Sequence, residues 1–159
     1  MTEIEKAYVA GFFDGEGCCL VTPNCQVRII IAQKDPGVLN WIAKEYGGKL
    51  TLKEKGQNAA KLWLNGSIEI QRFLFEIKPY LRCKNFEVDL ALQMIALNAT
   101  NKTRPQAKNG LFLPNPNKDE RERLFKLYRD YRNKTSQQSV ALRKTLENRK
   151  LSPITTPHS

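Results

Sequence analysis

The sequence lacks the residues on which histidine chemistry and structural zinc sites depend. Its one histidine, His158, stands next to the last of 159 residues, so general acid and base catalysis by histidine is not expected. The cysteines form no C-x-x-C pair, which argues against zinc and favours small apolar core residues. Carboxylate, lysine and metal ions are left as the means of catalysis. The four cysteines are Cys18, Cys19, Cys25 and Cys83.

Long apolar runs and a balance of charge are also missing. No apolar run approaches the roughly 20 residues that cross a bilayer, so no membrane partner is expected. The first residues lack the basic and apolar regions of a secretory signal, which favours reduced thiols inside a cell. Lysine and arginine number 26 against 16 acidic residues, a net charge of +10. This excess favours nucleic acid as a partner, although charge alone leaves open a merely soluble basic protein.

Hydrophobic periodicity and turn signals predict one α+β domain over residues 1–159. The expected order is helix, two strands, helix, two strands and helix, with two polar helices at the end. The core would span about residues 2–98, followed by a loop at 98–117, helices at about 118–150 and a flexible tail at 151–159. The elements are a helix from the Thr2 and Glu5 capping box to about Asp14, strands at 18–22 and 26–33, a helix from Asp35-Pro36 to Gly47-Gly48, strands at 50–55 and 61–64 around a turn at 56–58, a helix capped by Ser67 that ends at Pro79, and a helix at 85–97 with Phe86, Leu90, Met94 and Leu97 on one stripe.

The four strands predict an antiparallel sheet that is covered by helices on one face and free on the other. No long crossover connects the strands, and Val27, Ile29 and Ile31 alternate with Gln26, Arg28 and Ile30. A free sheet face in a basic protein can contact base edges and phosphates, while a merely solvated face is the simpler alternative. Its polar positions would include Thr22, Gln26, Arg28, Lys53, Lys55 and Lys61.

Residues 9–17, Val-Ala-Gly-Phe-Phe-Asp-Gly-Glu-Gly, form an apolar helix that carries small residues and ends in two acids. The small residues Ala10 and Gly11 allow a second helix to approach closely. Acids at the carboxyl end of a helix are disfavoured, because the last carbonyls already carry partial negative charge. A divalent cation bound by a carboxylate and by the Gly15 carbonyl would compensate. A helix stopped by Gly15 with solvated acids is the simpler alternative.

These nine residues resemble the LAGLIDADG motif of homing endonucleases. Ala10, Gly11, Asp14 and Gly17 match it by identity, and Glu16 stands for the second acid. The resemblance covers about residues 8–97 and implies the fold αββαββα, with an antiparallel four-stranded DNA-binding sheet, plus C-terminal helices. One copy of the motif is present. The resemblance to single-motif, group I intron-encoded members therefore implies a homodimer, with Ala7, Ala10, Gly11 and Asp14 at its interface.

The resemblance implies an enzyme that makes double-strand breaks in a long, pseudo-palindromic DNA site, one half-site per subunit. Glu16 and the Gly15 carbonyl would hold magnesium, and manganese or calcium could occupy the same site. Two Glu16 carboxylates side by side would repel each other unless cations lie between them. No small-molecule substrate is expected. The enzyme would work where its target DNA is held, in a chloroplast or mitochondrion if organelle-encoded and otherwise in bacterial cytoplasm.

Two further catalytic residues are implied by local resemblance. Gln33, at the end of the second strand, resembles the glutamine that orders solvent around the scissile phosphate, and Lys84 resembles the lysine that helps activate water or stabilise charge. A strand-end polar residue and a surface lysine are the simpler interpretations of the two. Relatives usually carry a basic residue shortly after the glutamine, but Asp35-Pro36-Gly37 occupies that region here, and Lys34 is the candidate replacement.

DNA contacts are expected from the two hairpins, with Arg28 the best candidate for a guanine because its guanidinium matches two major-groove acceptors. Other lysines, among them Lys102, Lys108, Lys118 and Lys134, would contact phosphates or solvent. An intron maturase, or a non-catalytic nucleic-acid-binding protein on the same scaffold, is the alternative, and the presence of the acid Glu16 favours the endonuclease. The predicted DNA-binding residues are Thr22, Asn24, Gln26, Arg28, Lys34, Lys53, Lys55 and Lys61.

Overall fold

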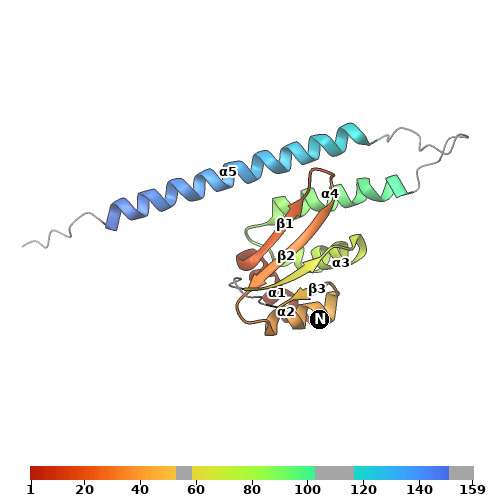
Figure 1. The fold of residues 1–159 in the computed structure, drawn as a ribbon, viewed down its shortest axis with the longest axis horizontal. Helices are drawn as coiled ribbons and strands as arrows, with labels where there is room; N and C mark the ends of the chain where they lie inside the picture. Colours follow the sequence, from red (N-terminus) through yellow and green to blue (C-terminus); the bar gives the residue numbers. More distant parts are fainter. Residues whose placement is uncertain (53–58, 103–116, 151–159) are drawn as a thin grey trace, which may run out of the picture. The chain divides into compact units, whose positions relative to one another are not determined.

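The computed structural model describes residues 1–52, 59–102 and 117–150, and only the backbone of residues 101–102 and 142–150. The chain divides into two compact units, Met1–Phe125 and Lys126–Ser159. The first unit has the predicted order αββαββα (Figure 1). The elements are α1 Glu3–Glu16, β1 Gly17–Val21, β2 Val27–Gln33, α2 Gly37–Tyr46, β3 Lys49–Thr51, β4 Ala60–Leu64, α3 Ser67–Ile77, the 3-10 helix η1 Lys78–Tyr80, α4 Asn85–Lys102 and α5 Lys118–Lys150.

The start of α1 is fixed by the predicted capping box. The backbone N–H of Glu5 donates to the Thr2 hydroxyl at 3.3 Å, and the Thr2 backbone N–H donates to the Glu5 carboxylate at 2.7 Å. The hydrogen bond from the Thr2 backbone lowers the pKa of Glu5. Each side chain therefore satisfies a backbone donor that the first helical turn leaves without a partner.

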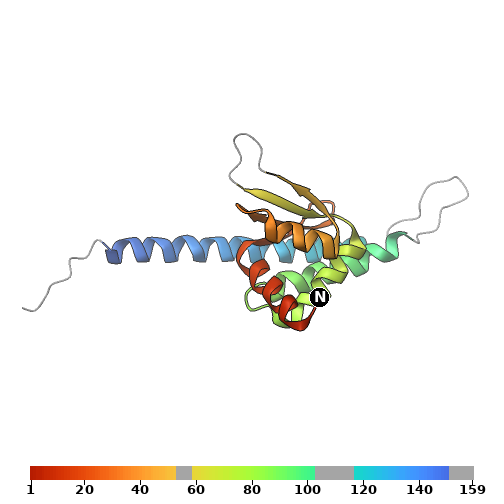
Figure 2. The same cartoon turned by 90° about the horizontal axis from the view of Figure 1, so that it is seen from below.

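The four strands form one antiparallel sheet in the order β1-β2-β4-β3. Alternate residues of β2 and β4 are fully buried, including Ile29, Ile31, Leu62 and Leu64. Helices α1 to α4 all contact strands of this sheet, and Figure 2 shows helices gathered on one side of it. The predicted sheet with one helix-covered face is therefore confirmed.

Aromatic rings join three helices inside this core. The Phe13 and Phe73 rings meet edge to face with centroids 5.4 Å apart, and Tyr46 meets Phe73 in the same way at 5.0 Å. Such pairs contribute about 1 kcal/mol each beyond the burial of their area. They fix both α1 and α2 against α3, and so fix the position of the motif helix that precedes the sheet.

Two helix starts differ from the prediction. Gly66 holds the cap position of α3, no side chain caps this helix, and Ser67 is already its first residue. Pro36 holds the cap position of α2, and the Asp35 carboxylate accepts the N–H of Gly37 at 2.8 Å. Ser67 as a cap was thus wrong, while Asp35 satisfies the first helical N–H from one residue further out.

The C-terminal helices also differ from the prediction. Helix α4 runs to Lys102 rather than 97, and Phe86, 41% exposed, does not share the buried stripe of Leu90 and Met94. One 33-residue helix, α5, replaces the two expected, because no glycine or proline interrupts residues 118–150. The predicted turn at 56–58, most of the predicted loop and the tail at 151–159 lie outside the described residues. No helix in the described ranges is long and apolar enough to cross a membrane.

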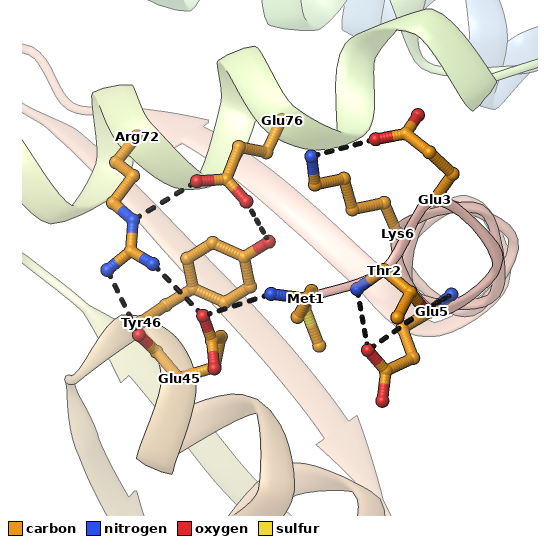
Figure 3. A network of polar contacts seen from close by, with 9 residues as sticks. All are labelled: Met1, Thr2, Glu3, Glu5, Lys6, Glu45, Tyr46, Arg72 and Glu76. Carbon is orange, nitrogen blue, oxygen red and sulfur yellow. Dashed lines mark hydrogen bonds and ion pairs between the residues drawn. The ribbon is translucent and has the colours of Figure 1, made fainter.

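A polar network ties the end of α2 to α3 (Figure 3). The Arg72 guanidinium donates to Glu76 at 3.1 Å and to the Glu45 carboxylate at 3.0 Å, and the Tyr46 hydroxyl donates to Glu76 at 3.1 Å. Burial, followed by the hydrogen bond to Glu76, raises the pKa of Tyr46. Burial alone would raise the pKa of Glu76, but hydrogen bonds from Arg72 and Tyr46 outweigh it and lower that pKa.

Replacing Glu76 with glutamine is expected to destabilise the fold in a pH-dependent way. Because the folded pKa of Glu76 lies below its ordinary value of 4.5, its stabilisation is present above that pH and lost as pH falls through the folded pKa. The partly exposed network should contribute about 1 kcal/mol, which lowers Tm by about 2–4 °C at neutral pH. Thermal unfolding of wild type and Glu76→Gln should differ at neutral pH and converge at a pH below the folded pKa of Glu76. A Glu76→Gln gap of equal size at both pH values would contradict this account.

Candidate active site and nucleic-acid interface

The carboxyl end of α1 presents the acid that the motif predicted. Glu16 is the last residue of the helix, it is exposed, and its side chain forms no hydrogen bond or ion pair with any residue the structure describes. The last carbonyls of a helix, that of Gly15 among them, lack partners within the helix. A carboxylate and a carbonyl oxygen therefore lie next to each other in the chain at one helix end, and both are ligand types that magnesium prefers.

Close packing explains the last glycine of the motif. A Cβ atom on Gly17 would lie 2.0 Å from the Phe13 ring and 2.6 Å from the Phe13 carbonyl oxygen. Its φ of −85° is open to any residue, so the requirement is steric rather than conformational. Glycine here lets β1 follow directly on α1 and keeps Glu16 at the junction.

The first acid of the motif, Asp14, holds a distant turn. Its carboxylate accepts the backbone N–H groups of Arg82 at 2.7 Å, Cys83 at 3.2 Å and Lys84 at 3.0 Å. Hydrogen bonds to a charged acceptor are the stronger kind, at about 1.5–3 kcal/mol each. Asp14 thereby fixes the segment that precedes α4 against the end of α1. This positioning role was missed at the sequence level, where Asp14 was assigned to a dimer interface.

Lys84 lies at the carboxyl end of α1. Its ammonium group donates to the carbonyl oxygen of Asp14 and stands 5.8 Å from the centre of the Phe13 ring. A cation at this position compensates the partial negative charge of the last carbonyls. The positive partner expected for the acidic helix end is therefore supplied in part by the chain itself, because the predicted lysine binds the helix end that carries Glu16.

Gln33 is the last residue of β2 and lies at the end of the sheet where α1 joins β1. Gly17 pairs with Ile31, so Gln33, two residues further along, continues past the junction of α1 and β1. Alternation places its side chain on the helix-covered face with Ile31. The Gln33 side-chain oxygen accepts the N–H of Lys34 at 2.7 Å, and Lys34 itself is exposed. The structure thus brings Glu16, Gln33 and Lys84 to one end of the helix layer.

The free face of the sheet carries a row of cross-strand pairs. Arg28 is exposed beside Leu20, and Lys61 stands between Ala32 and Thr51. At the centre, half-buried apolar side chains lie among the predicted polar positions, because Ile30 pairs with both Cys18 and Trp63. Lys53 and Lys55 lie outside the described residues, as does the Lys108 position, and Lys118 pairs with Glu122 at 3.9 Å. The side chain of Lys102 is not described.

The turn between β1 and β2 is held from outside the sheet. Within it, the Gln26 N–H donates to the Thr22 hydroxyl at 3.2 Å, and Cys25 adopts a positive φ of 60°. Asn98 of α4 donates to the Cys25 carbonyl at 2.7 Å, and Arg121 donates to the Asn24 carbonyl at 3.1 Å. These contacts fix a turn whose exposed members, Asn24 and Gln26, were predicted to contact DNA.

The outer face of α1 is apolar and exposed. Ile4 is 83% and Tyr8 52% exposed, and Ala7 and Gly11 lie on the same face. Nothing lies within 4 Å of a Cβ built on Gly11 or Gly15. Ala10 is fully buried in its own core and offers no surface to a partner, so its place in the predicted interface was wrong. The buried side of the helix, on which Ala10 lies with Val9 and Phe13, explains the error.

No group of three or more histidine, cysteine or acidic side chains able to hold a metal ion occurs among the described residues. If Glu16 and the Gly15 carbonyl bind a metal ion, they can supply only part of its set of ligands. A complete set needs further oxygen atoms, from water, from a bound phosphate or from a second copy of the chain.

Comparison with family models and with curated proteins gave no match. Among solved structures, the chain is similar to the homing endonuclease I-CvuI, in complex with the I-CreI target, with 23% identity over 64% of this chain and 71% of that one and a TM-score of 0.52. The LAGLIDADG meganuclease I-AabMI bound to uncleaved DNA shows 26% identity over 61% and 38%, with a TM-score of 0.51. The group I intron-encoded I-CeuI complexed with DNA shows 18% identity over 63% and 57%, with a TM-score of 0.53.

The class of protein follows from these likenesses and from the arrangement of the elements. It is an α+β protein with helices on one face of a four-stranded antiparallel sheet. More narrowly, the chain has the fold of the LAGLIDADG homing endonucleases, as the resemblance of residues 9–17 predicted.

Proposed function

We propose that this protein is a site-specific DNA endonuclease of the homing type, which cuts both strands of a long pseudo-palindromic site as a homodimer. The main support for this proposal is the exposed Glu16 carboxylate at the end of α1. Lys84 binds that helix end, and Gln33 lies at the end of the sheet where α1 joins β1. The solved neighbours I-CvuI and I-CeuI are homing endonucleases in complex with DNA, which supports DNA as the substrate.

Glu16 and the Gly15 carbonyl would hold a divalent cation, magnesium in the first place. The neighbour I-CvuI was crystallised with magnesium and with calcium, which supports a divalent ion here. When bound, the ion would supply charge neutralisation and an activated water for phosphodiester hydrolysis. The oxygen ligands and the absence of a carboxylate partner for Glu16 among the described residues fit such an ion.

The chain's own residues have separate tasks in this proposal. The ammonium of Lys84 is held on the Asp14 carbonyl and would stabilise negative charge that develops at the scissile phosphate. The Gln33 amide can donate and accept hydrogen bonds, which suits it to orient water. Asp14 keeps the 82–84 turn, and with it Lys84, in place.

The homodimer is supported by the glycines of α1. Glycine in a helix interior costs about 1 kcal/mol relative to alanine. The tight contact with Phe13 explains why Gly17 is a glycine, but Gly11 and Gly15 have open space around them. Close approach of a second α1 helix would account for both, and would also cover the exposed Ile4 and Tyr8 side chains.

Target recognition is assigned to the free sheet face. Arg28 would contact a base, and the half-buried Ile30 and Trp63 beside it form an apolar strip that can contact thymine methyl groups. Lys34 and Lys61 would contact phosphates at the strand ends. Two copies of this face, related by the dimer axis, require a target with two related half-sites.

Gly11→Leu is expected to convert the dimer into a folded, inactive monomer. Leucine would block the approach of a second helix, while the open space around Gly11 and the better helix propensity of leucine leave the monomer stable. Sedimentation should show the mass of one chain, and cutting of a DNA that contains the target with magnesium present should be lost. Ala99→Leu, a similar apolar addition at an exposed position of α4, should remain dimeric and active. A dimeric, active Gly11→Leu protein would refute this interface.

A further inference from the structure

The second part of α5 differs from the first in charge. Residues 118–125 hold three basic and three acidic side chains, whereas residues 126–150 hold eight basic and two acidic ones, a net charge of +6. More than half of the chain's net charge of +10 therefore lies on these 25 residues. Lys126, Arg129 and Lys134 are exposed and form no ion pair or hydrogen bond with any described residue.

The middle of α5 has almost nothing apolar with which to pack. Residues 132–141 are all exposed, and Val140 and Ala141 are the apolar residues among them. The Thr135 and Ser139 hydroxyls donate back to carbonyls of their own helix, at 3.1 Å and 3.0 Å, which does not strengthen a helix. Most helical stability in proteins comes from packing of an amphipathic face. Another source of stability is therefore needed along this stretch.

A second copy of the helix does not fit that need. A coiled coil requires apolar residues at two positions of each seven, and residues 132–139 contain none. Net positive charge on both helices would also oppose their pairing. A polyanion fits better, because its negative charge would neutralise the basic residues and lower the cost of holding them close together.

We propose that α5 beyond Phe125 binds the phosphate backbone of a nucleic-acid duplex, independently of its base sequence. Lys126 to Lys134 covers about 12 Å of helix axis at about 1.5 Å per residue. One strand of B-DNA presents about three phosphates over that length. Lys126, Arg129 and Lys134, three cations without a partner among the described residues, therefore match in number the phosphates available. This inference goes beyond the proposed cleavage and does not depend on it.

The test compares two triple variants of the full chain. Lys126→Gln with Arg129→Gln and Lys134→Gln removes the three charges, and Lys126→Arg with Arg129→Lys and Lys134→Arg keeps them. Fluorescence anisotropy measures the affinity for two duplexes of about 30 base pairs, one of DNA and one of RNA, whose sequences are unrelated to the proposed target. EDTA is present to prevent cutting, and the salt concentration is varied from about 50 to about 200 mM. Circular dichroism checks that both variants keep the helix.

Log affinity falls linearly with log salt, and each phosphate that the protein neutralises makes this slope steeper by about 0.9. The slope of the charge-removing variant should therefore be shallower than that of the wild type by about 2–3. The charge-keeping variant should follow the wild type. A change on both duplexes supports binding of backbone in general, and a change on one alone identifies DNA or RNA as the partner. Unchanged slopes on both, or an equal loss in both variants, overturn the proposal. Cutting of the target is scored separately, so this inference and the proposed nuclease can fail independently.

Discussion

Glu16→Gln should abolish double-strand cutting and leave DNA binding intact. The glutamine keeps the shape of the side chain but loses the charge that would hold a divalent cation, and Glu16 has no partner within the described chain whose loss would disturb the fold. Loss of a residue that merely supports a metal ligand already costs about 10–100-fold in activity, so loss of the ligand itself should cost more than about 100-fold. Plasmid linearisation with magnesium measures cutting, and gel shift with calcium measures binding.

Two controls make this result specific. Glu16→Asp keeps the charge with a shorter side chain and should still cut, since aspartate is the acid in the motif that this chain resembles. Glu69→Gln removes an exposed acid from α3 and should cut like the wild type. If Glu16→Gln cuts as fast as Glu69→Gln, the metal-ligand role of Glu16 is wrong.

Asp14→Ala should cost both stability and activity, because one carboxylate holds three backbone N–H groups of residues 82–84. The bonds from Arg82 and Cys83 are exposed, so water can replace the lost acceptor there, and only the Lys84 N–H is partly buried. The loss should therefore be about 1 kcal/mol per bond, about 3 kcal/mol in all, or about 6–12 °C in Tm. Asp14→Asn retains an oxygen acceptor, so its Tm should lie between that of the wild type and that of Asp14→Ala. Asp35→Ala, which removes one exposed hydrogen bond to Gly37, should lose about 1 kcal/mol or less.

Activity separates positioning from mere stability in this series. Cutting is measured well below the Tm of each variant, where all are folded. Asp14→Ala should then cut more slowly than Asp35→Ala, and about as slowly as Lys84→Met, because the Lys84 ammonium is attached to the same helix end. Full cutting by folded Asp14→Ala protein would show that the three hydrogen bonds of Asp14 serve stability alone.

Local signals account for the parts of the fold that the sequence predicted. The Thr2 and Glu5 capping box and the Gly47-Gly48 stop each act within a few residues, so the elements they bound could be placed closely. The alternation of side chains along β2 predicted that Ile29 and Ile31 are buried, because helices were expected to cover one face of the antiparallel sheet. The motif at residues 9–17 then connected this order to a known fold.

The errors arose where distant contacts decide. Asp14 accepts hydrogen bonds from a turn 68 to 70 residues away in the sequence. Hydrophobic periodicity describes neighbours within one helix or strand and cannot predict such a contact. Ala10 was assigned to an interface because it is small, yet the packing of α1 turns it inward, and Gly11 outward. Trp63 was not placed on the free face, although alternation along β4 puts it on the same face as Lys61. Its pairing with Ile30 depends on β4 lying beside β2, which the linear sequence does not state.

Double-strand cutting by the wild-type protein tests the central claim most directly. Because the motif resembles that of intron-encoded enzymes, the substrate is DNA from the intronless allele of the gene that would host this reading frame, incubated with magnesium or with EDTA. We expect one defined break with magnesium and none with EDTA. Protein that binds this DNA tightly and never cuts it would contradict the proposed nuclease and favour a maturase or a non-catalytic binding protein on the same fold.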